Sequence, residues 1–114
     1  MKEISLRTVD GDVVCERCRV ADNALTRMRG LLGRRSLEPG EGLLLRPAGS
    51  IHMFFMRFAI DAVFVDRQLV VRKVVPELQP WRVAFAPGSR SVLELAAGEA
   101  ERRGIRPGQQ LVVA

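Results

Sequence analysis

The sequence predicts a mainly β protein of the α+β type, a small closed or partly closed β-barrel of short strands with one or two short helices. Two observations support this fold class. Short apolar runs recur along the chain and are separated by glycine, proline and aspartate turn signals. About eight or nine such runs in 114 residues favour a barrel, because closure removes unpaired strand edges.

The N-terminal part reads as a β-hairpin followed by a helix. Alternating segments 4–8 and 12–21 flank Asp10-Gly11, a strong hairpin signal. Asp22 or Asn23 is the expected N-cap of the helix, and Gly33 is its expected end. Helical spacing predicts that four residues of this helix face the core, namely Leu25, Met28, Leu31 and Leu32. Gly30 within this pattern predicts close packing of the helix against a strand.

From Gly42 onward, apolar runs alternate with turns in a pattern typical of a sheet. A short helix is expected over residues 97–103, with Gly104 at its end. The strands are expected over residues 42–46, 50–66, 69–75, 81–86, 91–96 and 110–113.

Size, cysteines and hydropathy predict one cytoplasmic domain spanning residues 1–114. The chain is 47% hydrophobic, which suffices for a single core. Cys15 and Cys18 do not form a disulfide framework, so a reducing compartment is expected. The N-terminal segment lacks the apolar core of a signal peptide, and no apolar run approaches membrane-spanning length. We therefore expect a soluble protein without membrane association.

The protein is basic, with a formal net charge of +5, and 16 of its 18 basic residues are arginines. Arginine suits contact with phosphates, carboxylates or acidic surfaces. The arginines are scattered, however, and aromatic content is only 5% with no tyrosine, which supplies little for base stacking. A GC-rich genome explains arginine enrichment equally well, so nucleic-acid binding is possible but not favoured.

The densest apolar stretch, residues 50–66, contains the only histidine and is the first candidate site. His52, Arg57 and Asp61 are polar groups that need partners there. If the stretch is one strand, His52 and Met56 face one way while Arg57 and Asp61 face the other. One interpretation has Arg57 and Asp61 as an ion pair that brackets a turn. The other places all three at the mouth of a barrel, where an imidazole can act as base, ligand or hydrogen-bond partner.

Glu94 is the second candidate, because it is expected to share a strand face with the apolar Val92. A buried carboxylate favours an arginine partner, and Arg29 on the predicted helix is the candidate. The pair is interpreted either as a structural ion pair or as part of an anion-recognising pocket.

The sequence gives little support for metal-dependent or nucleophilic chemistry. A Cu(I) site of His52, Met53 and Met56, with Cys15 and Cys18, matches soft-ligand chemistry. Strand alternation nevertheless places Met53 and Met56 on opposite faces of a strand, and it does the same for Cys15 and Cys18. Neither pair is therefore expected to chelate a metal. No Gly-x-Ser-x-Gly, His-Glu-x-x-His or phosphate-loop motif is present. We expect no metal, no cofactor and no catalytic residues.

Several motifs in one order resemble the bacterial and archaeal family named domain of unknown function 192. They are TRMRGLLGR, GEGLLL, SIHMFFMRFAIDAVFVD, SVLELAAG and GIRPGQQL, which span nearly the whole chain. The resemblance implies a small β-rich barrel with flanking helices and no established activity or cofactor. The chain departs from the family pattern at Met53, Ala59 and Gln109. The positions carried over by motif are Arg27, Arg29, Gly30, Leu31, Gly42, His52, Met56, Ile60, Asp61, Phe64, Leu93, Glu94, Gly98 and Gly108.

Together these observations predict a binding module that holds an unidentified small polar or anionic molecule at a barrel mouth. The expected ligand-binding residues are His52, Arg57, Asp61, Arg29 and Glu94. Two alternatives are a nucleic-acid-binding domain that uses surface arginines and a hydrolase-like enzyme that uses His52 with Asp61. The sequence does not indicate the oligomeric state. The expected structural residues are Gly30, Gly42, Met56, Phe64, Gly98 and Gly108.

Overall fold

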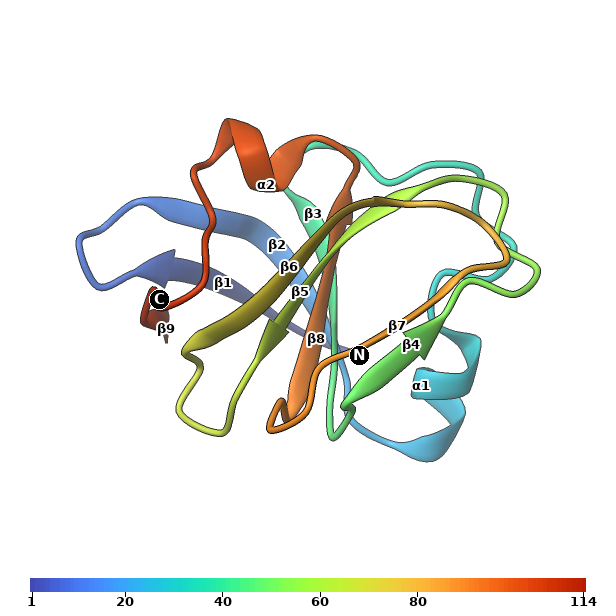
Figure 1. Ribbon diagram of the computed structural model, residues 1–114, viewed down its shortest axis with the longest axis horizontal. Helices are drawn as coiled ribbons and strands as arrows, with labels where there is room; N and C mark the ends of the chain where they lie inside the picture. Colours follow the sequence, from blue (N-terminus) through green and yellow to red (C-terminus); the bar gives the residue numbers. More distant parts are fainter.

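Seven strands form one curled sheet in the order β6-β5-β8-β3-β2-β1-β9, and β4 pairs with β7 in a small second sheet (Figure 1). The structure is a computed structural model that describes residues 1–114. The mainly β fold class is thereby confirmed. The elements are β1 (Lys2–Thr8), β2 (Val13–Ala21), α1 (Ala24–Arg29), β3 (Glu41–Leu45), β4 (Ser50–His52), β5 (Ile60–Val65), β6 (Val71–Leu78), β7 (Val83–Phe85), β8 (Ser91–Ala96), α2 (Glu99–Arg102) and β9 (Leu111–Val113). Neither helix is long and apolar enough to cross a membrane.

The sheet curls far enough for its two edges to meet at one end. The Val71 amide donates to the Gln109 carbonyl at 2.9 Å, and the Leu111 amide donates to the Leu69 carbonyl at 2.9 Å. Val70 and Gln110 form an isolated bridge between the same segments. These bonds join the start of β6 to β9, so part of each edge is paired and the sheet is a partly closed barrel.

Two apolar cores lie on opposite faces of the curled sheet, and strand alternation assigns residues to them. On β5, Ala62 and Phe64 belong to one core, while Val63 and Val65 belong to the other. The core with Phe64 is covered by the β4–β7 sheet, which contributes Ile51 and Ala84. The other core lies inside the curled seven-stranded sheet. The candidate site lies on the side covered by the β4–β7 sheet.

Helix α1 differs from the sequence prediction in its length and in its exposed side chains. Asn23 caps it as expected, with the Thr26 amide donating to Asn23 Oδ1 at 2.9 Å. The helix ends at Gly30, whose positive φ of 47° terminates it three residues before the predicted end. A Cβ on Gly30 would meet only ordinary contacts, so the predicted close packing at Gly30 is wrong. The helix buries none of its residues, and Leu25 and Met28 are exposed.

The prediction of one strand over residues 50–66 is also wrong. Strand β4 ends at His52 and β5 begins at Ile60, with a loop between them. Met53 fixes this loop from within the core: its amide donates to the Arg82 carbonyl at 2.7 Å, and its carbonyl accepts from the Trp81 amide at 2.8 Å. These bonds tie the loop to the segment that precedes β7. The face assignments from strand alternation therefore do not apply to residues 53–59.

Cys15 and Cys18 lie in the same core, which contradicts their predicted placement on opposite faces. Leu6 pairs with Cys15 and Ile4 pairs with Cys18, so β2 has one residue more than β1 over this stretch. Such a β-bulge resets the alternation and turns both side chains inward. Both thiols are free and buried, in the core on the opposite face of the sheet from β4.

Gly42 is needed because three neighbours occupy the space of a side chain. A Cβ at Gly42 would lie 2.7 Å from Cys15 Sγ, 3.0 Å from Leu95 Cδ2 and 3.2 Å from the Glu94 carbonyl oxygen. We expect Gly42→Ala to lower the free energy of unfolding by about 1 to 3 kcal/mol, measured by urea denaturation. Gly49→Ala is the matched control, since its Cβ would come no closer than 3.6 Å to any atom. Equal stability of the two variants would contradict this interpretation.

Candidate functional site

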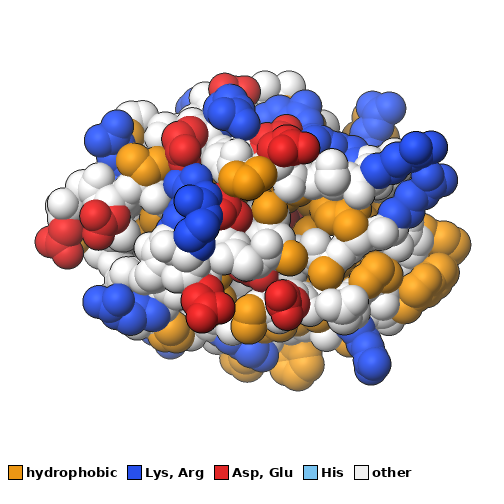
Figure 2. Space-filling view, turned by 90° about the horizontal axis from the view of Figure 1, so that it is seen from above, with side chains coloured by type: hydrophobic (Ala, Val, Ile, Leu, Met, Phe, Trp, Pro, Cys, Tyr) orange, Lys and Arg blue, Asp and Glu red, His pale blue; other side chains and the backbone are white.

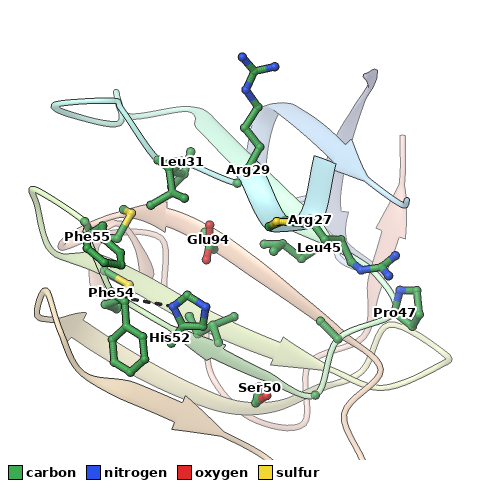
Figure 3. A pocket seen from close by; sticks show the side chains of 18 residues that line it. Arg27, Arg29, Leu31, Leu45, Pro47, Ser50, His52, Phe54, Phe55 and Glu94 are labelled. Atoms are coloured by element: carbon green, nitrogen blue, oxygen red, sulfur yellow. Dashed lines mark hydrogen bonds between the residues drawn. The ribbon is translucent and has the colours of Figure 1, made fainter. Parts of the chain in front are cut away.

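A pocket of about 600 Å³ opens between α1 with the turn that follows it and β4 with the loop that follows it (Figure 3). Its walls are mostly apolar and include Leu31, Leu45, Met53 and Met56. The polar side chains in its lining are few: Arg27, Arg29, Ser50, His52 and Glu94. A pocket of this size with an apolar lining and a few polar groups is typical of small-molecule sites.

Glu94 lies deep in this pocket, on strand β8. It shares a sheet face with Val92, as the sequence predicted, and its carboxyl oxygens are open to the pocket, because no fully buried side-chain oxygen lacks a partner. The side chain is buried, yet no protein group donates a hydrogen bond to its carboxyl. Burial without a partner raises the pKa of Glu94 from 4.5 to about 8. At neutral pH the group is therefore mainly a carboxylic acid, which can both donate and accept a hydrogen bond.

His52 is the second polar group that the structure places at the pocket. It is exposed, in the last position of β4, and its Nδ1 accepts from the Phe54 amide at 3.4 Å. Its ring stacks on Phe54 with centroids 4.7 Å apart. Figure 3 shows His52 and Glu94 lining the same pocket from opposite sheets. The stacking and the amide contact orient the ring and leave Nε2 free to contact a ligand.

The predicted pairing of Arg29 with Glu94 is wrong. Both residues line the pocket, but they form no ion pair, and the Arg29 guanidinium extends away from Glu94 (Figure 3). Arg29 is exposed because α1 lies on the surface with no buried residue. Arg27 is also directed elsewhere, since its Nη1 donates to the Arg46 carbonyl at 3.3 Å. The pocket therefore contains a carboxyl without a cation beside it.

Asp61 and Arg57 do not line the pocket, and the ion pair predicted between them is absent. Asp61 is fully buried and accepts three backbone hydrogen bonds. Its Oδ1 accepts from the Glu77 amide at 2.8 Å, and its Oδ2 accepts from the amides of Gly98 and Ala100 at 3.0 and 2.8 Å. The carboxylate thus caps α2 from a neighbouring strand. Arg57 is exposed in the loop after β4.

Exposed aromatic residues beside the pocket were not part of the predicted site. Phe54 stacks on Trp81 at 5.9 Å, and the Phe55 and Trp81 centroids are 4.9 Å apart. Phe55 and Trp81 have φ angles of 65° and 71°, a left-handed conformation that costs about 1 to 2 kcal/mol in a residue with a side chain. In the sequence these residues read as core positions. A signal was present only in Gln79-Pro80, which predicts a turn before Trp81.

The fold and the pocket define a small, partly closed β-barrel with an apolar opening beside the β4–β7 sheet. Residues 6–113 match the family DUF192, described as "Uncharacterized ACR". The chain belongs to this family, as its motifs indicated.

Two curated relatives agree with this assignment. A UPF0127 protein of Thermococcus sibiricus is 33% identical over 96 residues, which cover 77% of this chain and 60% of the relative. A UPF0127 protein of Pyrococcus abyssi is 32% identical, with 70% of this chain and 80% of the relative covered. This chain thus spans 60% of the length of the Thermococcus relative.

Two crystal structures share the fold at 24% identity. One is a protein of unknown function from Novosphingobium aromaticivorans, with a TM-score of 0.82 over 96% of this chain and 83% of that one. The other, from Sinorhizobium meliloti, is described as a "putative transcription regulator" and has a TM-score of 0.85 over 97% of this chain and 92% of that one. At this identity the two structures establish the fold alone.

Proposed function

We propose that the protein is a small ligand-binding module that holds a mostly apolar molecule carrying one hydrogen-bonding group. The observation that supports this most directly is the Glu94 side chain, which is 7% exposed, lines a pocket of about 600 Å³ and makes no hydrogen bond to the protein. Because the carboxyl oxygens are open to the pocket, a ligand that fills the pocket would shield them from water. Such a ligand must supply a hydrogen bond to Glu94 in place of water.

The lining favours a different ligand from the polar or anionic molecule that the sequence suggested. Arg29 extends away from the pocket interior and Arg27 is bonded to the Arg46 carbonyl, so no guanidinium is available beside Glu94. The walls offer leucine and methionine side chains. An apolar body with an amide, hydroxyl or carbonyl group directed at Glu94 and His52 suits this lining.

Recognition without turnover is favoured over the hydrolase-like alternative. That alternative requires a carboxylate to orient the imidazole of His52. Asp61 serves α2 and lies outside the pocket lining, while Glu94 is mainly protonated at neutral pH. Asp61 is thus unavailable to His52, and the raised pKa of Glu94 disfavours the ionised form that a catalytic histidine would need.

A thermal-shift comparison of ligands with one apolar chain and different head groups tests this proposal. Octanamide is expected to raise the melting temperature of the wild type by a few degrees. Glu94→Leu is expected to lose most of that shift, because it keeps an apolar side chain and removes the hydrogen bond. His52→Ala is expected to reduce the shift.

Glu101→Leu is the matched control, since Glu101 is exposed on α2 and distant from the pocket lining. It should keep the full shift. Octanoate should stabilise the wild type less than octanamide, because its negative charge would enter an apolar pocket without a cation. Equal shifts for wild type and Glu94→Leu with every compound would refute the proposal.

A further inference from the structure

Six apolar side chains lie exposed in the lining of the pocket or on segments beside it, and we name them the apolar rim. They come from three short segments: α1 and the turn after it, the loop after β4, and the segment before β7. Exposure is high for several of them, including Met28 and Phe55 at 72%. The apolar rim consists of Leu25, Met28, Leu32, Phe54, Phe55 and Trp81.

Charge is segregated toward the same end of the molecule. The segments 23–37, 42–60 and 78–93, which supply the rim and the β4–β7 sheet, contain eight arginines and no acidic residue. Their formal charge is +8, and the rest of the chain carries −3. Figure 2 shows hydrophobic and basic side chains without acidic ones at the right-hand end, whereas elsewhere on this face basic and acidic side chains are mixed.

Five of the eight arginines in these segments are free to meet a partner. They are exposed and form no ion pair, and they are Arg29, Arg35, Arg57, Arg82 and Arg90. On α2 and directly after it, Arg102 and Arg103 instead pair with Glu99, whereas Arg106 is exposed and unpaired. Exposed arginines without an ion pair also occur elsewhere, namely Arg7, Arg17, Arg67 and Arg106, but the remainder of the chain carries a formal charge of −3. The net positive charge therefore lies in the segments that supply the apolar rim.

We propose that the apolar rim docks onto the surface of an anionic lipid membrane. Aromatic side chains suit the interface between headgroups and acyl chains, and arginines beside them attract anionic lipids. The rim is held in place for this role, since hydrogen bonds between Met53 and residues 81 and 82 fix the two aromatic segments together. The pocket opens between the rim residues, so an apolar ligand could pass into it directly from the bilayer.

Other partners match this surface less well. A second copy of the chain would bring two positively charged ends together, which repel each other. Single-stranded nucleic acid is bound largely through base stacking on aromatic side chains. Half of the rim, namely Leu25, Met28 and Leu32, gives a nucleobase no stacking surface. A fluid bilayer accommodates separate apolar protrusions without a complementary shape.

The sequence alone predicted no membrane association, because no apolar run has membrane-spanning length. A docking surface needs no such run, since three short segments together supply the rim. This inference stands independently of the pocket ligand: vesicle binding tests the rim, and the octanamide shift tests the pocket.

Vesicle co-flotation tests the membrane proposal. We expect the protein to float with vesicles of equimolar phosphatidylcholine and phosphatidylglycerol, and to float poorly with phosphatidylcholine alone or in high salt. Trp81 is the only tryptophan, so its fluorescence should shift to shorter wavelength on binding.

Phe55→Asn, which suits the left-handed backbone at that position, should weaken binding about tenfold. Arg57→Gln and Arg82→Gln should each weaken it about fivefold.

Val9→Asn is the matched control, because Val9 is 62% exposed at the tip of the β1–β2 hairpin, outside the rim segments. It should bind vesicles as the wild type does. Failure to float with the anionic vesicles would overturn the proposal, and so would equal binding by Phe55→Asn and Val9→Asn. A larger Trp81 shift with single-stranded DNA than with vesicles would overturn it in favour of nucleic acid.

Discussion

Replacement of Asp61 by alanine is expected to lower the free energy of unfolding by about 3 to 5 kcal/mol. The carboxylate is fully buried and accepts hydrogen bonds from the amides of Glu77, Gly98 and Ala100. Alanine would leave these three donors without their acceptor in the interior. Because a domain of this size is stable by only about 5 to 15 kcal/mol, the loss should be visible in urea denaturation.

Asp66→Ala provides a matched control for burial. Asp66 also accepts two backbone hydrogen bonds, from the amides of Gln68 and Val70 at 2.9 and 3.0 Å. Its side chain is 19% exposed at the β5–β6 turn, so water can replace the lost acceptor. We expect Asp66→Ala to lower the free energy of unfolding by about 0.5 to 2 kcal/mol.

The loss for Asp61→Asn should fall between those for Asp61→Ala and Asp66→Ala, because asparagine keeps an acceptor oxygen. Similar losses for Asp61→Ala and Asp66→Ala would show that burial of Asp61 does not set its contribution.

The same contacts explain why the role of Asp61 was not predictable from the sequence. The pattern placed a carboxylate in an apolar run, correctly indicating that it needs partners. Its partners are backbone amides from residues 16 to 39 positions away. Every residue except proline has such an amide, so no side-chain pattern identifies which ones will meet a given carboxylate. Arg57 was chosen as its partner only because it is near in sequence.

Local signals predicted most of the fold. Asp10-Gly11 marked the first hairpin and Asn23 marked the start of α1. Strand periodicity placed Glu94 on the face of Val92, which proved to be the face of the pocket. These features depend on neighbours a few residues apart, where propensity and spacing act directly.

The pocket mouth was predicted poorly because its residues have the composition of a core. Phe54, Phe55 and Met56 continue an apolar run without interruption, so the run read as one strand. The structure instead turns the chain after His52 and exposes the two phenylalanines. Hydrophobic patterning assumes that apolar residues are buried, and it therefore fails where a surface is apolar. The same assumption assigned Leu25 and Met28 to the core.

Glu94→Gln is expected to stabilise the protein progressively as the pH rises. In the folded state the pKa of Glu94 is raised from 4.5 to about 8, so the stability associated with this group is fully present below about pH 4.5. It is lost as the pH rises toward 8, because the unfolded chain ionises while the folded protein stays protonated. The total loss is on the order of 4 kcal/mol. Glutamine does not ionise, so the Glu94→Gln variant does not lose this stability as the pH rises.

Urea denaturation of both proteins between pH 5 and pH 8 measures this difference. The gain for Glu94→Gln should be small near pH 5 and should reach several kcal/mol near pH 8. Glu101→Gln, at an exposed position on α2, should show no such trend. A constant difference between Glu94→Gln and wild type at all pH values would mean that Glu94 ionises normally in the folded protein. The lining of the pocket would then include a carboxylate, and cationic ligands such as octylamine would replace octanamide as the expected occupants.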